Sequence, residues 1–507
     1  MAEISSNKEQ LKLRKHLIDP QAIRLIPETL ARKWNAIPLE IKNNVLQVAM
    51  ANPADLIALE ALEATTHMTI EPEAATAQEV QEAIDFNYRS YDEIEKQISN
   101  IPLPSEVSEE RVQTVSVNDA PIVRALALII DEAVKAGASD VHIQPQEENL
   151  RVRYRIDGTL HEALTLPLGT ANPLISRIKI LAGMNIADHL RPQDGQFSIT
   201  PKGRQEKMDI RVGIIPTVYG EMAALRLLYK ARTLMTLSQL GFLSEGLAKY
   251  EAMLKVPHGM ILLCGPTGSG KTTTLYASIN TLDLTGRNVI TVEDPVEYHF
   301  KKINQIQVNP RAGLTFASGL RSILRLDPNV ILIGEIRDAE TAGIAVQAAL
   351  TGHLVLSSIH ANEAVGVVFR LLDLGIERFL VASALIGVVA QRMVRKICPE
   401  CAEPVDVSVS DHIAYVRQTG EERSQFLSGR GCKSCAYTGY QGRTGLYEIL
   451  RVSEEIRAMV LNGASATELR NQAMKEGMMP LIKEGMLKVK ADITTPDEVL
   501  CKAFSVD

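Results

Sequence analysis

The sequence has few aromatic residues, no long apolar run and no excess of basic charge. Aromatic residues make up 4% of the 507 positions, with one tryptophan, and the formal net charge is −7. An acidic balance gives no overall field that would attract a polyanion, so we expect no nucleic-acid partner. No stretch reaches the ~18 apolar residues of a membrane-spanning helix, and the first residues lack the apolar segment of a signal peptide. These absences predict a cytoplasmic protein.

Cysteine is also scarce, and its spacing points to a metal. Four of the six cysteines form two CxxC pairs, Cys398 with Cys401 and Cys432 with Cys435. Two such pairs can present four thiolates to one tetrahedral ion, a closed ligand set that is typical of structural zinc. Redox activity of a CxxC pair is the alternative. Because paired knuckles in a reducing compartment favour metal, we expect Zn²⁺ to support folding here without taking part in catalysis.

The length predicts several domains, since chains divide into units of roughly 100–200 residues. We expect an N-terminal docking module at 1–90, a linker at 91–118, a second N-terminal domain at 119–232, an α/β core at 233–395, a zinc-binding element at 396–440 and a C-terminal helical subdomain at 441–507.

Local patterns support these boundaries. Residues 91–118 combine prolines with an acidic run, a composition that cannot bury much surface. Pro121 follows Asn118-Asp119 and predicts the first turn of a helix that runs to about residue 136. Residues 151–156 alternate in polarity and then meet Asp157-Gly158, which predicts a hairpin with a type I′ turn and three arginines on one face. Strands are also expected around Asp209-Ile-Arg-Val and Ala224-Leu-Arg-Leu.

Four apolar runs in the 233–395 core predict a buried parallel sheet. They begin near residues 260, 288, 329 and 354, and the segments between them are long enough for crossover helices. Strands that are apolar on both faces are what a sheet covered on both sides requires. We therefore expect a doubly wound α/β domain.

A glycine-rich loop follows the first of these runs. The candidate nucleotide-binding residues are Gly265, Pro266, Thr267, Gly268, Ser269, Gly270, Lys271, Thr272 and Thr273. The pattern GxxxxGK[ST] lets backbone N–H groups approach phosphates, while the lysine reaches the β/γ-phosphates and the Thr after it binds Mg²⁺. A chance match in a glycine-rich turn is the alternative, but the strand before the loop and the helix after it favour a site for ATP and Mg²⁺.

Carboxylates and histidines follow other strands of the core. The segment 293–297 is acidic, and Glu335 comes after the run 330–333. Helix capping is the alternative for each cluster alone; beside a P-loop we expect Glu335 to be the Walker B acid and Glu297 to be a second candidate for activating water. His360 could sense the γ-phosphate through a hydrogen bond, although a structural role is equally open.

Two arginines complete the candidate catalytic set. In oligomeric NTPases a positive charge from another domain or subunit stabilises the transition state of phosphoryl transfer. Arg211 and Arg226 lie on predicted strands before the core and are candidates for this role. A solvated strand face is the alternative.

Taken together, these motifs resemble the secretion-ATPase superfamily, specifically the type II secretion and type IV pilus assembly ATPases, over nearly the whole chain. The matching segments are 265–273 (Walker A), 291–297 (acidic box), 323–338 (Walker B), 351–363 (histidine box), 390–395, the tetracysteine element and 442–449. The sequence departs from the usual pattern at Met222, Leu326 and residues 361–363, none of which is a phosphate ligand.

The resemblance implies a RecA-like P-loop ATPase domain and a homo-hexameric ring. It further implies that Arg211 and Arg226 reach the nucleotide. ATP hydrolysis would drive assembly of a pilus or pseudopilus through an inner-membrane platform protein, with the ATPase held peripherally at that membrane. The N-terminal module is similar to the later half of a domain that binds cyclic di-GMP in some relatives; its binding repeats are not evident before residue 20, so we expect docking and no such ligand. A nucleic-acid translocase and a non-hydrolysing nucleotide sensor are the competing functions.

Overall fold

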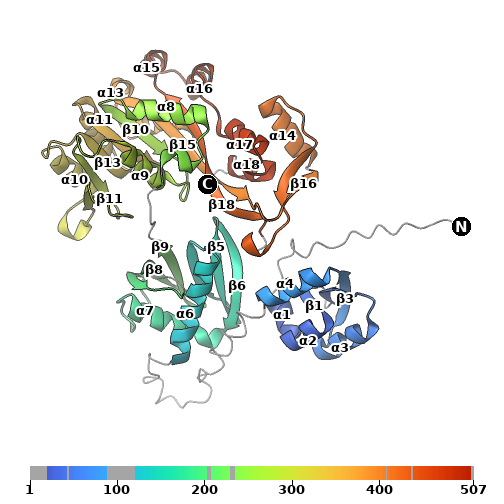
Figure 1. The fold of residues 1–507 in the computed structure, drawn as a ribbon. Helices are drawn as coiled ribbons and strands as arrows, with labels where there is room; N and C mark the ends of the chain where they lie inside the picture. Colours follow the sequence, from blue (N-terminus) through green and yellow to red (C-terminus); the bar gives the residue numbers. More distant parts are fainter. Residues whose placement is uncertain are drawn as a thin grey trace. The chain divides into compact units, whose positions relative to one another are not determined.

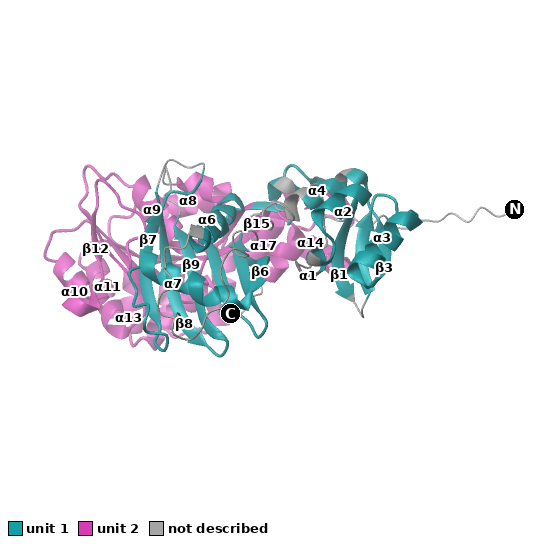
Figure 2. Cartoon of the chain, turned by 90° about the horizontal axis from the view of Figure 1, so that it is seen from below, with its two compact units in different colours: residues 1–230, 398–402, 429–441 teal, residues 231–397, 403–428, 442–507 magenta. Residues whose placement is uncertain are grey.

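The computed structural model describes residues 20–42, 45–87, 120–202, 207–228, 235–406, 408–435 and 438–503. The expected linker and the segment before residue 20 lie outside these residues. By their internal contacts, the residues divide into two compact units (Figure 2), and each unit is considered separately below. The first comprises residues 1–230, 398–402 and 429–441, and the second comprises residues 231–397, 403–428 and 442–507.

Residues 20–87 of the first unit form a small three-stranded sheet with helices. Strand β2 pairs antiparallel with β1 and parallel with β3. Helix α2 ends at Asn35, whose left-handed conformation (φ 44°) turns the chain into β1, and Asp55 caps α3 by accepting a hydrogen bond from the Ala58 N–H. The elements are α1 (Pro20–Leu25), α2 (Glu28–Trp34), β1 (Ala36–Lys42), β2 (Val45–Met50), α3 (Leu56–Thr66), β3 (Thr69–Ala74) and α4 (Ala77–Asn87).

Residues 120–228 form a six-stranded sheet in the order β6-β5-β4-β9-β8-β7, in which neighbouring strands are antiparallel. Two helices, α6 and α7, share a core with one face of this sheet. The elements are α6 (Ala120–Lys135), β4 (Asp140–Pro145), β5 (Asn149–Ile156), β6 (Thr159–Pro167), the 3₁₀ turn η4 (Leu168–Thr170), α7 (Ala171–Leu181), β7 (Gln193–Ile199), β8 (Met208–Thr217) and β9 (Gly220–Leu228).

The predicted hairpin at Asp157-Gly158 is confirmed. Strands β5 and β6 pair antiparallel, and both turn residues have positive φ (47° and 90°), as a type I′ turn requires. Residues 150, 152 and 154 of β5 are buried in the core, so the three arginines between and beyond them share the opposite face. The sheet therefore has one apolar face under helices and one polar face.

The second unit is built on a seven-stranded sheet in the order β12-β11-β13-β14-β10-β15-β18 (Figure 1). From β12 to β15, each strand pairs in parallel with its neighbour. The elements up to the end of β15 are η5 (Leu237–Leu240), α8 (Ser244–Leu254), β10 (Gly259–Cys264), α9 (Lys271–Thr281), β11 (Val289–Glu293), β12 (Asn304–Gln307), η6 (Pro310–Ala312), α10 (Phe316–Ile323), β13 (Val330–Ile336), α11 (Ala339–Leu350), β14 (Leu354–Ile359), α12 (Ala364–Asp373), α13 (Arg378–Ala384) and β15 (Leu385–Ile397).

Alternate residues of the central strands serve two different cores. In β10, Met260, Leu262 and Cys264 pack in the core that includes α10 to α13. Ile261 and Leu263 pack in the core that includes α8 and α9. The four apolar runs are the strands β10, β11, β13 and β14, so the prediction of a parallel sheet covered on both faces is confirmed.

The rest of the chain adds a small two-stranded sheet and further helices. The elements are β16 (Ala402–Asp406), α14 (Val409–Thr419), β17 (Gln425–Gly429), η7 (Lys433–Cys435), β18 (Tyr440–Arg451), α15 (Glu454–Leu461), α16 (Ala466–Lys475), α17 (Leu481–Lys490) and α18 (Pro496–Ala503). Among the described residues, no helix is both long and apolar enough to cross a membrane.

A buried ion pair within α17 makes hydrogen bonds to the backbone of β18. Lys488 and Glu484 are almost fully buried, with Nζ 3.5 Å from Oε1. Lys488 also donates to the carbonyl oxygens of Gly241, at 2.5 Å, and of Gly445, while Glu484 accepts the Tyr447 N–H. Burial raises the pKa of Glu484 to about 7 despite the neighbouring lysine, and burial lowers the pKa of Lys488.

Candidate functional site

The glycine-rich loop joins β10 to α9, the strand–loop–helix order that a phosphate-binding loop requires. Gly265, Gly268 and Gly270 all have positive φ (143°, 78° and 87°), a conformation that L-residues avoid. Such turns aim successive N–H groups to one side and create a site for anions. The α9 helix begins directly at Lys271 and points its positive end at the same place.

The side chains of the loop fit a polyphosphate. The Nζ of Lys271 lies over the loop and donates to the carbonyl oxygens of Gly265 (2.7 Å) and Pro266 (2.9 Å). Ser269 is 3% exposed, and its buried hydroxyl has no hydrogen-bond partner among the residues that the structure describes. An unsatisfied buried hydroxyl is costly unless a ligand completes it. Thr272 at the start of α9 is exposed, so its hydroxyl is open to a metal ion bound with the phosphates.

Strand β15 forms the floor of the loop through Gln391 and Arg392, which belong to the matching segment 390–395 but had no role assigned from the sequence. Gln391 accepts a hydrogen bond from the Thr274 hydroxyl at 2.9 Å. Its carbonyl oxygen lies so close to Gly265 that a Cβ there would approach it to 2.3 Å. Arg392 is 4% exposed and donates to the carbonyl oxygen of Asn362 at 3.0 Å. The contacts of Gln391 with Gly265 and Thr274 could not be read from the sequence, because Gln391 is far from the loop along the chain.

The sequence predicts Glu335 after its strand, but the residue lies within β13. The strand continues to Ile336 across a shift of register with β14. The Glu335 carboxylate forms an ion pair with Arg337 and lies 3.3 Å from His360 Nε2. Burial raises the pKa of Glu335, but the hydrogen bond and charge of Arg337, together with His360, outweigh burial and lower it. The same carboxylate acts on Lys271, whose pKa burial lowers and Glu335 partly restores. Glu335 is thus an ionised carboxylate within electrostatic reach of the P-loop lysine.

The two histidines of the predicted histidine box differ. His360 follows β14, is 60% exposed at its side chain and reaches Glu335. His353 precedes β14, and its Nδ1 lies 2.9 Å from the Ala348 carbonyl oxygen at the end of α11. His353 has the kind of contact that is expected of a structural histidine. His360 lies beside the Glu335 carboxylate at the carboxyl end of the sheet. In an open parallel sheet, ligands bind at that end of the strands.

The acidic segment after β11 contains one buried and one exposed glutamate. Glu293 is 3% exposed and its carboxylate accepts hydrogen bonds from Tyr276, Thr291 and Gln305. Glu297 is exposed, and its N–H donates to the Tyr276 hydroxyl at 3.3 Å. Of the two, Glu297 is the glutamate at the surface.

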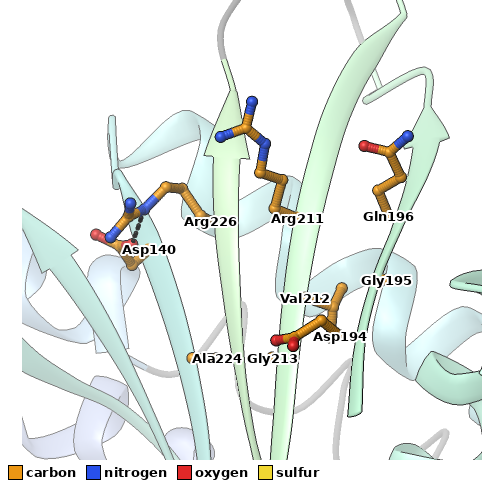
Figure 3. Close-up of a pocket in the computed structure, with 9 residues that line it drawn as sticks. All are labelled: Asp140, Asp194, Gly195, Gln196, Arg211, Val212, Gly213, Ala224 and Arg226. Atoms are coloured by element: carbon orange, nitrogen blue, oxygen red, sulfur yellow. Dashed lines mark hydrogen bonds and ion pairs between the residues drawn. The ribbon is translucent and has the colours of Figure 1, made fainter. Parts of the chain in front are cut away.

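Arg211 and Arg226 belong to the first unit, where they line a pocket of about 490 Å³ on the polar face of the six-stranded sheet (Figure 3). The two arginines are directly opposite each other on β8 and β9. Gly213 and Ala224, the next pair along these strands on the same face, keep the floor of the pocket low. Asp140 holds Arg226 through an Oδ1–Nε contact of 3.1 Å. Asp140 and Asp194 line the same pocket, so two carboxylates accompany its two arginines.

The four cysteines lie together in the first unit. Their sulfur atoms are all within 4.8 Å of one another. Measured separations are 3.7 Å for Cys398–Cys432, 3.9 Å for Cys401–Cys435 and 3.7 Å for Cys432–Cys435. A tetrahedral zinc with Zn–S bonds of ~2.3 Å separates its sulfur atoms by about 3.8 Å, so the cluster has the dimensions of a Cys₄ zinc site.

Comparison with known proteins agrees with this geometry. A model of the type II/IV secretion system protein family matches residues 115–501, and a model of the MshEN domain matches residues 7–93. The type IV pilus assembly ATPase PilB of Myxococcus xanthus is 39% identical over 491 residues, which are 95% of this chain and 87% of that protein. Type II secretion system protein E of Pseudomonas aeruginosa is 45% identical over 399 residues, which are 78% of each chain.

Solved structures share the fold. The pilus retraction motor PilT with bound ADP is 26% identical with a TM-score of 0.50, and the match covers 75% of this chain and 97% of PilT. The ATPase DotB of Legionella pneumophila has a TM-score of 0.56 over 74% of this chain and 93% of its own, at 21% identity, and so speaks for the fold alone. With a family model that spans most of its length and relatives this similar, the chain belongs to the type II/IV secretion system protein family.

Proposed function

We propose that this protein is an ATP-hydrolysing motor that works as a homo-hexamer and powers assembly of a type IV pilus or a type II secretion pseudopilus. Its location would be the cytoplasmic side of the inner membrane, where a platform protein of the pilus or secretion system binds it. The observation that carries the proposal is the meeting of the P-loop with Glu335 and His360 at one end of a parallel sheet. The similarity to a pilus assembly ATPase and to a type II secretion protein supports assembly as the process that the motor drives.

The roles proposed for the residues follow from their surroundings. Lys271 and the loop N–H groups would hold the β/γ-phosphates, and Thr272 would bind Mg²⁺, which neutralises charge that develops on the phosphate oxygens. Glu335 would hold the metal and its water as the Walker B acid. Glu297 would activate the attacking water, and His360 would report the γ-phosphate through its contact with Glu335.

Arg211 and Arg226 would provide the positive charge that stabilises the transition state, from another domain or subunit. Their pairing side by side on β8 and β9, on the polar face of the sheet, supports this role. The cysteine cluster would bind one structural zinc ion through Cys398, Cys401, Cys432 and Cys435, which the sulfur separations support.

Turnover by the purified full chain tests the central claim. Lys271→Ala should abolish ATP hydrolysis, because it removes the charge that contacts the transferred phosphate. Lys255→Ala is a matched control, since Lys255 is an exposed lysine at the end of α8. Equal turnover in the wild-type protein and Lys271→Ala would leave only a nucleotide sensor, and stimulation by nucleic acid without a membrane partner would favour a translocase.

Mixing experiments test whether the site is shared. Arg226→Ala and Lys271→Ala should each lose turnover, and mixed rings should recover part of it if one subunit provides the arginine and its neighbour provides the lysine. No recovery in mixed rings of confirmed hexameric mass would contradict sharing between subunits. Recovery of a platform protein by the tagged chain from membranes would identify the client.

A further inference from the structure

The first residue of the acidic segment 293–297 is the centre of a buried hydrogen-bond network that has no role in the proposed reaction. At its centre is the carboxylate of Glu293, which is 3% exposed. It accepts hydrogen bonds from the Tyr276 hydroxyl, from Thr291 Oγ1 at 2.6 Å and from Gln305 Nε2 at 3.2 Å. Three donors satisfy both of its oxygens, so Glu293 is occupied within the protein and is not open to water or metal.

Tyr276 links this network to Glu297. Its hydroxyl donates to Glu293 and accepts the backbone N–H of Glu297 at 3.3 Å. Its ring packs edgewise against Tyr298, with centroids 5.9 Å apart, and against Phe300, at 5.0 Å. Burial, with Glu293 beside it, raises the pKa of the Tyr276 hydroxyl, so the phenol stays protonated and keeps donating at physiological pH.

Tyr276 lies on α9, the helix that begins at Lys271. The hydroxyl therefore connects the phosphate-binding helix to the backbone of Glu297 through a single side chain. The position of the Glu297 backbone is thereby linked to the helix that begins at the P-loop.

We propose that Tyr276 and Glu293 are positioning residues that hold Glu297 at a set place in front of the bound nucleotide. The inference rests on the proposed role of Glu297 in activating water. Glu293 orients the Tyr276 hydroxyl, and that hydroxyl fixes the Glu297 main chain. Catalytic groups displaced by about 1 Å can lose roughly 10²-fold in rate, so loss of the hydroxyl should lower turnover and leave nucleotide binding to the loop intact.

Tyr276→Phe tests the inference, with Tyr250→Phe as its matched control. Tyr250 is also fully buried against α9, and its hydroxyl bonds Ser278 Oγ at 2.7 Å, in a contact that does not involve Glu297. Tyr276→Phe loses two buried hydrogen bonds, to the Glu293 carboxylate and from the Glu297 N–H, whereas Tyr250→Phe loses one, and both keep the ring. Both should lower the unfolding temperature, Tyr276→Phe by more, because it removes a donor to a buried carboxylate. Only Tyr276→Phe should lower kcat, by ~10- to 100-fold, with the KM for ATP little changed. Equal kcat in the two variants would overturn the proposal.

A double-mutant cycle separates this inference from the proposed function itself. Glu297→Gln should lower kcat strongly, and adding Tyr276→Phe to it should cause no further loss, because the hydroxyl acts only through Glu297. A further loss equal to that of the single Tyr276→Phe variant would refute the positioning role. If Glu297→Gln instead retains full turnover, the proposed role of Glu297 is what fails.

Discussion

The closest contact in the P-loop leads to a prediction that needs only one added methyl group. Gly265 has a φ of +143°, and a Cβ built on it lies 2.3 Å from the carbonyl oxygen of Gln391 and 2.9 Å from Ser269 Oγ. Ordinary contacts begin near 3.4 Å, so in Gly265→Ala the loop and β15 must separate by about 1 Å. A backbone oxygen within a sheet cannot move away alone. Since a displacement of this size costs roughly 10²-fold in rate, we expect Gly265→Ala to lose about that much turnover.

Gly268→Ala is the matched control in the same loop. Its φ is +78°, but beyond its two chain neighbours no atom of the described residues lies within 4 Å of the added Cβ. This variant should pay only the cost of a left-handed alanine, ~1–2 kcal/mol, and keep the shape of the loop. The assays are titration with a fluorescent ATP analogue, steady-state ATP hydrolysis and thermal unfolding. The steric argument is wrong if the two variants lose the same activity, or if Gly265→Ala binds nucleotide like the wild type.

Three further predictions follow from the cysteine cluster and the buried pair on α17. Elemental analysis should find about one zinc ion per chain, and Cys432→Ser should lower both the zinc content and the unfolding temperature; a folded wild-type chain without metal would contradict the site. Lys488→Met leaves Glu484 buried without its partner and should cost about 3–5 kcal/mol, measured by urea unfolding, whereas Lys488→Met with Glu484→Gln should recover part of that loss. The pKa of Glu484 is about 7 in the folded chain against an ordinary 4.5, so the folded state holds this proton more tightly and stability should fall as the pH rises from 4.5 to about 7. Glu484→Gln should flatten that part of the profile, and an unchanged slope would show that another group is responsible.

Features encoded within a few neighbouring residues were predictable from the sequence. The hairpin at Asp157-Gly158 depends on two adjacent residues that tolerate positive φ. The strand of Met260 to Cys264 depends on an unbroken apolar run, and the P-loop on its own glycines. Each of these patterns carries its physical cause in local sequence, so the structure reproduces it.

Features that depend on residues far apart in the sequence were not predictable. Gln391 closes the floor of the loop from a different strand, and only the parallel pairing of β10 with β15 brings it there. Glu293 and Glu297 look alike in an acidic run, yet burial against Tyr276 separates a structural acid from an exposed one. Tertiary packing decides which of the two side chains is buried, and the residues of the motif alone do not indicate it.

Strand β15 has a mechanical consequence. Gln391, at the middle of β15, contacts the P-loop and α9. The strand ends at Ile397, whose N–H donates to the Ile493 carbonyl oxygen at 2.9 Å. The next residue is Cys398, the first cysteine of the cluster. At ~3.3 Å per residue, the six steps from Gln391 to Ile397 span about 20 Å. An extended strand is close to its maximum length, so stretching of the chain between Gln391 and Ile397 can absorb little of a displacement along the strand. We therefore expect nucleotide binding to change hydrogen exchange around Cys398. Two glycines inserted after Ile397 would lengthen the chain at that point and should abolish this change. If the change persists, the displacement travels by another route.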